Sequence, residues 1–133
     1  AEQCPKYDLP IVAMINAYKN MVYIATFEKS NGSFLCSKAP EVVRVQNLDQ
    51  YIKAPVYVVG DGYLAYQKYF SPQIHKLIQR PEASHDEPSA RAVAEIVLRQ
   101  ATFSKHWSEL LPLYLRASEA EENIKGIKFQ PLV

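Results

Sequence analysis

The stretch Pro55-Val56-Tyr57-Val58-Val59-Gly60-Asp61-Gly62 decides the fold, because it separates two patterns of secondary structure. Its first five residues are all apolar, which predicts a strand buried on both faces in the middle of a sheet. The turn formers of Gly60-Asp61-Gly62 then end the strand sharply. The residues before this stretch are typical of antiparallel strands, and those after it are typical of alternating helices and strands.

The part of the chain before Pro55 predicts an antiparallel meander. Leu9 to Ala17 and Met21 to Glu28 are rich in β-branched and aromatic residues, as strands are. Asn31-Gly32 is the strongest short signal for a hairpin and leads into a third strand. We expect Pro40 to interrupt or end that third strand, and Glu41 to Val45 could continue it at a sheet edge.

The remaining residues predict helices that alternate with strands. A short helix, a second helix, a strand and a longer helix are expected at residues 47–52, 63–70, 73–78 and 88–101. Asn47 can cap the first of these, and Pro88 fits the first turn of the last. The last helix carries an apolar stripe, formed by Ala90, Val93, Ala94, Val97, Leu98 and Ala101. An extended segment is expected at Leu111 to Leu115.

This order of elements defines an α/β fold. A meander followed by βα units gives a mixed sheet with antiparallel first three strands and helices packed on it. The same order is found in a ribonuclease-H-like lobe, and in each lobe of the sugar-kinase, Hsp70 and actin superfamily. Fold-level analogy of this kind assigns no activity.

Length and composition exclude several classes of protein. The 133 residues are enough for one domain, and 48% apolar with 22% charged residues excludes disordered and fibrous chains. The formal charge of +1 lacks the basic excess of a dedicated nucleic-acid binder. No apolar run approaches the length of a membrane span, and the start shows no signal-peptide pattern. We expect a cytoplasmic protein with Cys4 and Cys36 reduced, the alternative being a disulfide between them.

Few residues suggest catalysis. Asp61 follows a strand and could bind a metal or a nucleotide, but a tight turn in which Asp61 caps the next helix explains it better. The spacings of His75, His85 and His106 match no zinc signature. The sequence therefore predicts no catalytic set, no metal site and no cofactor.

Two further patterns have ordinary structural explanations. Cys36 is expected to be a buried strand thiol. Tyr63, Tyr66 and Phe70 are spaced along one helix face, which is either core or an interface with a missing partner. The nine tyrosines could form a stacking platform for bases, but no basic stripe accompanies them.

Three stretches resemble the TsaB (YeaZ) family, bacterial proteins needed to make threonylcarbamoyladenosine on tRNA. Pro112-Leu113-Tyr114-Leu115-Arg116-Ala117-Ser118 is similar to its C-terminal pattern Pro-x-Tyr-aliphatic-Arg, followed by a small residue and Ser. Ile11 to Ala17 with Met21 to Tyr23 resembles its strand-turn-strand, and Val58 to Gly62 resembles its glycine turn. Asn16 departs from the family, which commonly has Asp there.

The resemblance implies that residues 1–122 are the second, C-terminal lobe of such a protein, followed by a tail at 123–133. The first lobe, with its Gly-Pro-Gly-Ser motif, is absent from the chain. The family pattern implies a non-catalytic scaffold that partners TsaD-like and TsaE-like subunits and reaches tRNA only indirectly. The matching positions of uncertain role are Asp61, Gly62, Tyr114, Arg116 and Ser118.

Further expectations follow from the implied role. Tyr114 should pack in the core, and Arg116 should pair with an acid and fix the last segment, in preference to touching tRNA. A missing lobe should leave an exposed apolar patch through which the chain self-associates.

Two other classes of function stay open. The family's older label is glycoprotease-like, and Asp61 with His75 or His85 could serve a small hydrolase or peptidase. The lobe could also be the nucleotide-binding half of an actin-like ATPase.

Overall fold

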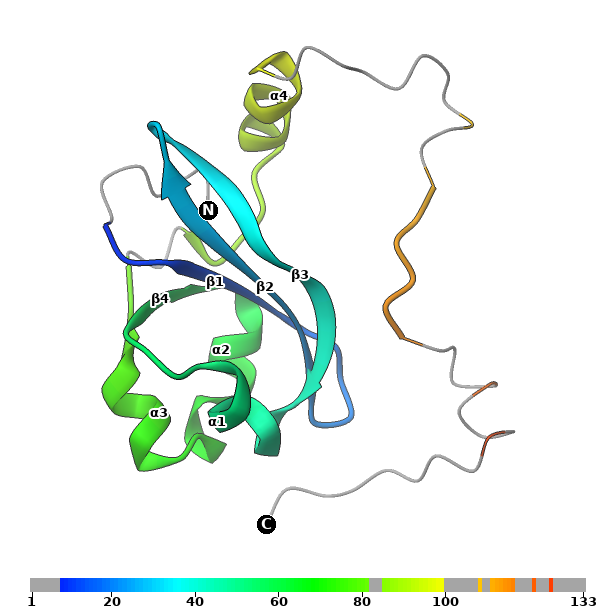
Figure 1. Ribbon diagram of the computed structural model, residues 1–133. Helices are drawn as coiled ribbons and strands as arrows, with labels where there is room; N and C mark the ends of the chain where they lie inside the picture. The colour runs from blue at the N-terminus through cyan, green and yellow to red at the C-terminus, as the bar shows by residue number, and fades with distance from the viewer. Residues whose placement is uncertain are drawn as a thin grey trace.

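The computed structural model describes residues 8–81, 85–99 and 111–116, together with Ser108, Glu121 and Lys125. A five-stranded sheet lies at its centre, in the order β3-β2-β1-β4-β5 (Figure 1). The strands are β1 (Ile11–Asn16), β2 (Met21–Ser30), β3 (Ser33–Arg44), β4 (Val56–Val59) and β5 (Ile78–Gln79). The first three strands pair antiparallel, whereas β1 with β4 and β4 with β5 pair parallel. The predicted mixed sheet is confirmed.

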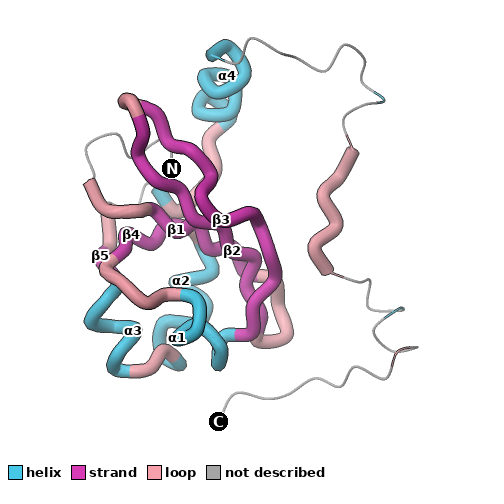
Figure 2. Tube along the Cα trace, viewed as in Figure 1, coloured by secondary structure: helices cyan, strands magenta, loops and turns pink. Residues whose placement is uncertain are grey.

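The helices divide between the two sides of this sheet. They are η1 (Val45–Asn47), α1 (Leu48–Tyr51), α2 (Asp61–Tyr66), η2 (Gln67–Tyr69), α3 (Pro72–Leu77) and α4 (Ala90–Arg99). Figures 1 and 2 show α1, α2 and α3 gathered beneath the sheet, with α4 on the other side. Among the described residues, no helix is long and apolar enough to cross a membrane.

The main core lies between the sheet and α1 to α3. Alternate side chains of β1 reach it, because neighbouring residues of a strand point to opposite faces. The strands and helices contribute Val12, Met14, Val22, Ile24, Leu48, Ile52, Val58, Tyr66, Phe70 and Ile74. A smaller cluster around Ile11 and Val59 occupies the opposite face. Since Tyr66 and Phe70 are buried, the aromatic helix face predicted from the sequence is core and not an interface.

The strand predicted at Gln73 to Ile78 is wrong, because most of this stretch forms α3. Ser71 caps that helix, where its Oγ accepts a hydrogen bond from the Ile74 N–H at 3.2 Å, and Pro72 occupies the first turn. The cap and the proline favour the helix over the imperfect polar-apolar alternation. The short strand β5 follows at Ile78 and Gln79.

Strand β3 differs from the prediction at two positions. It runs through Pro40 to Arg44, because an edge strand tolerates a residue without an N–H. The pairing with β2 is irregular around Thr26. Cys36 is exposed, so the buried thiol was a wrong prediction, and its Sγ donates to the Lys38 carbonyl oxygen at 3.1 Å.

Two predicted helix starts also differ. Asn47 precedes α1 but its side chain makes no capping hydrogen bond, since η1 already turns the chain there. Helix α4 begins at Ala90, after Pro88, and its cap is Ser89, whose Oγ accepts from the Ala92 N–H at 3.1 Å. A serine side chain satisfies the first-turn amide that a proline cannot reach.

Candidate functional site

Three stretches that lie far apart in the sequence meet at the carboxyl end of β1. The backbone N–H of Asn16 donates to Asp61 Oδ1 at 3.0 Å. The Arg116 guanidinium donates through Nη1 to the Ala17 carbonyl oxygen at 2.6 Å. We call Asn16, Ala17, Tyr18, Asp61 and Arg116 the β1 junction. It joins the strand-turn-strand, the glycine turn and the C-terminal motif into one place.

The turn between β1 and β2 is strained. Tyr18, Lys19 and Asn20 have φ values of 56°, 49° and 60°, a left-handed run without a glycine. Residues other than glycine enter this region at a cost, and such strain tends to collect at functional sites. The turn is held by Asn16 Oδ1, which accepts from the Tyr18 N–H at 2.8 Å, and by the Met21 N–H, which donates to the Tyr18 carbonyl oxygen. This anchoring explains an asparagine at position 16, because its side chain accepts from the backbone two residues on.

Asp61 does not cap α2 as predicted. Gly60 occupies the cap position with φ +107°, and Asp61 is the first residue of the helix. The Asp61 carboxylate instead ties α2 to β1 through the Asn16 N–H. The tight turn is confirmed, but its aspartate accepts a hydrogen bond from β1 and does not cap α2.

Gly62 lets α2 lie against β1. A Cβ at this position would lie 2.8 Å from Met14 Cγ and 2.9 Å from the Met14 carbonyl oxygen. The glycine is therefore required by close packing of the helix on the strand.

In the C-terminal motif, Tyr114 does not lie where the sequence analysis expected it. This side chain is 84% exposed, so the prediction that it packs in the core is wrong. Arg116 does fix the end of the segment, through the carbonyl of Ala17. Ser118 lies outside the described residues, as do Cys4 and His106.

Replacing Arg116 with alanine should free this segment. A charge-assisted hydrogen bond is worth about 1.5 kcal/mol, which corresponds to roughly a tenfold change in the open population. We therefore expect chymotrypsin to cleave at Tyr114 about ten times faster in Arg116→Ala than in the parent. Arg99→Ala, on the exposed end of α4, is the matched control and should leave the rate unchanged. Equal rates in Arg116→Ala and the parent would contradict the anchor.

The histidines named in the hydrolase hypothesis lie in different surroundings from Asp61. His75 is exposed on α3 and its ring lies 5.9 Å from the Phe70 ring. His85 lines a hollow of about 190 Å³ between the sheet and α4, together with Gly60. Asp61 faces Asn16 instead. Within residues 8–81, 85–99 and 111–116, no three His, Cys, Asp or Glu side chains are grouped to hold a metal ion.

An ion pair between Arg80 and the buried Asp86 closes the carboxyl end of β4, and the sequence analysis did not predict it. Asp86 is buried, and its Oδ1 accepts from the Gly60 N–H at 2.8 Å. Its Oδ2 pairs with Arg80, which also donates to the Val58 carbonyl oxygen. The Arg80 guanidinium lies 4.2 Å from the centre of the Tyr63 ring.

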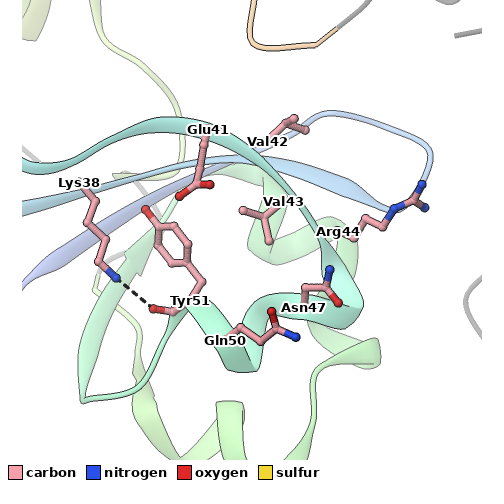
Figure 3. A pocket seen from close by; sticks show the side chains of 8 residues that line it. All are labelled: Lys38, Glu41, Val42, Val43, Arg44, Asn47, Gln50 and Tyr51. Atoms are coloured by element: carbon pink, nitrogen blue, oxygen red, sulfur yellow. Dashed lines mark hydrogen bonds between the residues drawn. The ribbon is translucent and has the colours of Figure 1, made fainter. Parts of the chain in front are cut away.

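Another hollow lies beside β3 and α1 (Figure 3). Its volume is about 550 Å³, and its lining is Lys38, Glu41, Val42, Val43, Arg44, Asn47, Gln50 and Tyr51. Lys38 Nζ donates to the Tyr51 carbonyl oxygen at 3.3 Å and lies 4.6 Å from the centre of its ring. Thr26 Oγ1 donates to the Tyr51 hydroxyl at 3.3 Å. Tyr51 is therefore held from both ends.

The phenol of Tyr51 gives the fold a dependence on alkaline pH. Burial raises the pKa of Tyr51, the hydrogen bond from Thr26 lowers it, and the negative charge of Glu41 raises it further, with a net rise. The folded state therefore keeps this proton longer than the unfolded state, so the free energy of unfolding falls as pH rises above about 10. We expect urea titrations to show a smaller alkaline loss of stability in Tyr51→Phe than in the parent. The exposed Tyr114→Phe is the control, and a parent-like loss in Tyr51→Phe would contradict the assignment.

Comparison with known proteins supports the fold. No family model matches the chain, and no curated protein matches it. The structure is similar to a crystal structure of an uncharacterized protein from Pseudomonas aeruginosa that is described as similar to peptidase YeaZ. The TM-score is 0.55 at 19% identity, over 82% of this chain and 50% of that one. The likeness shows a YeaZ-like fold, consistent with a ribonuclease-H-like lobe, and the chain spans half the length of that protein.

Proposed function

We propose that this chain is the second lobe of a TsaB-like protein, a non-catalytic scaffold in the machinery that makes threonylcarbamoyladenosine on tRNA. The β1 junction is the observation that carries the proposal. The three stretches that resemble the family are separate in sequence, and two hydrogen bonds join them in space. The YeaZ-like fold of the solved structure supports the same assignment.

The hydrogen bonds of two carboxylates, Asp61 and Asp86, support a structural role for these groups. Asp61 sits where an enzyme of this topology could place a reactive carboxylate, at the end of a central strand. Its Oδ1 holds the backbone of Asn16, so the carboxylate ties a helix to a strand. Asp86, the buried carboxylate nearby, is likewise paired with Arg80 and with the Gly60 N–H. These acids stabilise the carboxyl ends of β1 and β4.

The proposed partners are TsaD-like and TsaE-like subunits in the cytoplasm, with tRNA reached only through the TsaD-like subunit. Residues 1–122 would form the lobe and 123–133 a tail. A match to half of the YeaZ-like protein supports a single lobe of a two-lobe protein.

Reconstitution tests the proposed role. The full-length protein that carries this lobe is combined with TsaD, TsaE, ATP, threonylcarbamoyl-adenylate and tRNA, and transfer of the labelled threonylcarbamoyl group to tRNA is measured. We expect modification to require this protein, and His75→Ala and His85→Ala to leave the rate unchanged, because a scaffold needs no general base. Absence of any effect on tRNA modification would refute the scaffold.

A second assay separates the scaffold from the hydrolase alternative. The chain alone is incubated with a mixture of peptides, and cleavage is followed by mass spectrometry. The scaffold predicts no cleavage. Turnover that disappears in both Asp61→Asn and His85→Ala would instead favour a peptidase.

A further inference from the structure

The outer side of β3 carries backbone groups that no neighbouring strand binds among the described residues, because β3 lies at the edge of the sheet. The Val45 N–H donates to the Asn20 carbonyl oxygen at 3.0 Å, and this pair continues the register of β3 with β2. In an antiparallel pair, alternate residues direct their backbone groups toward the partner strand. Val43 therefore bonds toward β2, whereas the N–H and carbonyl of Val42 and the N–H of Arg44 point outward.

The first part of this edge is protected against further pairing. The register skips from Lys38 to Glu41, so the strand is irregular at Ala39 and Pro40. A bulge twists an edge strand away from other chains, and proline offers no N–H. Residues 41–44 follow in regular register, so this part of the edge can pair with a further strand.

The hollow of about 550 Å³ opens on the same part of the edge. It is lined by residues 41–44 in succession, and neighbouring side chains of a strand point to opposite faces of the sheet. Figure 3 shows Val42 and Val43 on opposite sides of β3, with Val43 on the side of Tyr51. A hollow that meets all four residues reaches around the edge of the strand.

The side chains around this hollow favour a carboxylate ligand. Arg44 is half-buried, and among the described residues its guanidinium has no hydrogen-bond or ion-pair partner, nor have the amides of Asn47 and Gln50. A guanidinium that has lost part of its water gains from a carboxylate partner. Lys38 adds a second positive charge to the lining, against one negative charge at Glu41.

We propose that β3 at residues 41–44 binds an extended acidic peptide of another protein, added to the sheet as a further antiparallel strand. The peptide exchanges two backbone hydrogen bonds with Val42 and accepts one from the Arg44 N–H. Its residue opposite Arg44 is Asp or Glu, whose carboxylate pairs with the guanidinium on the same face. Its residue opposite Val43 enters the hollow, beside the Asn47 amide.

An extended peptide is the occupant that matches both sets of groups. A free anion would bind the guanidinium and the amides and leave the outward backbone of Val42 without a partner. The binding surface is short, so we expect a dissociation constant of roughly 10 to 200 μM, as in transient complexes. The inference rests on the edge and the hollow and does not depend on the proposed function.

Selection of random peptides displayed on phage against the immobilised chain tests the proposal. We expect the enriched peptides to carry Asp or Glu within a run of β-branched residues. The enriched peptides are then labelled with fluorescein, and their affinity for the chain is measured by fluorescence anisotropy. Absence of any enriched peptide, or enriched peptides without an acidic residue, would overturn the proposal.

A charge exchange tests the pairing with Arg44. Arg44→Glu should weaken binding of the selected peptide about tenfold, because a charged hydrogen bond becomes a repulsion. The same peptide with lysine in place of its acidic residue should bind Arg44→Glu more tightly than it binds the parent. Lys76→Glu is the matched control, since Lys76 lies on α3 outside the hollow and undergoes the same change of charge. Equal affinity in Arg44→Glu and the parent would contradict the site.

The backbone of Val42 separates strand addition from binding by side chains alone. Val42→Pro removes the outward N–H, and an edge strand tolerates proline where the N–H faces solvent. We expect it to weaken binding about tenfold, whereas Val42→Ala, which keeps the N–H, binds like the parent. Circular dichroism checks that both variants are folded.

Hydrogen exchange measured by NMR gives a readout that needs no variant. The bound peptide should slow exchange of the Val42 and Arg44 amides and leave that of Val43, which already bonds toward β2, nearly unchanged. Unchanged exchange at Val42 and Arg44 in the presence of a bound peptide would refute strand addition.

Discussion

Gly60→Ala is expected to lower the free energy of unfolding by about 4 kcal/mol, a large part of the stability of an ordinary domain. Gly60 has φ +107° and ψ 161°, a region that only glycine populates readily. A Cβ there would lie 2.2 Å from the Met14 carbonyl oxygen. Met14 is fully buried in β1 and paired with Ile24, so its backbone has no room to move away.

Gly32→Ala is the matched control. Gly32 also has a positive φ, +81°, but a Cβ there would meet nothing within 4 Å. Only the conformational cost then remains, about 1 kcal/mol. Urea denaturation of both variants separates the two contributions, and equal losses would show that β1 and the Gly60 turn are not held as closely as the structure has them.

Asp86→Ala should cost about 3 kcal/mol, because it removes a buried carboxylate that accepts from two donors. The Gly60 N–H and the Arg80 guanidinium both donate to this carboxylate. The side chains of Asp86 and Arg80 are 6% and 23% exposed, so water replaces the lost bonds only in part. The loss should appear as a lower urea midpoint with an unchanged slope.

Glu95→Ala supplies the comparison at the surface. Glu95 pairs with Arg91 one turn away on α4, at 2.8 Å. Exposed pairs of this kind contribute little to the free energy of unfolding, because water screens them. A loss in Asp86→Ala as small as that in Glu95→Ala would contradict a structural role for the Arg80–Asp86 pair.

The strands of this fold could be predicted because their signals are local. The β-branched runs of β1, β2 and β4 have the right length and bury the predicted side chains. Helix α3 was missed because its apolar spacing was given more weight than its start. Ser71 followed by Pro72 is a helix start that the sequence displays, and it outweighs an imperfect alternation.

The candidate site could be predicted only in part. The turn at Gly60 could be predicted, since glycine beside aspartate after a strand is typical of a tight turn. The contacts of Asp61 and Arg116 were not, because both bind backbone atoms, Asn16 N–H and Ala17 carbonyl oxygen. Every residue has backbone polar atoms, so the identities of residues 16 and 17 do not indicate that a side chain binds there. The exposure of Tyr114 was also hidden, since an aromatic residue among leucines is typical of a core.

The position of β1 determines the order in which this chain can fold. Val12 pairs with Thr26 on one side, across a short turn, and with Val58 on the other, across most of the meander and α1. Hairpins close within microseconds, whereas pairing between distant residues is slower. The β1–β2–β3 meander can therefore assemble while the rest of the chain is still being synthesised. Until Phe70 and Ile74 have been synthesised and have packed on the sheet, the side chains of Met14 and Ile24 stay exposed to water. A nascent chain stalled at that stage would present an apolar sheet beside an open edge, which favours aggregation.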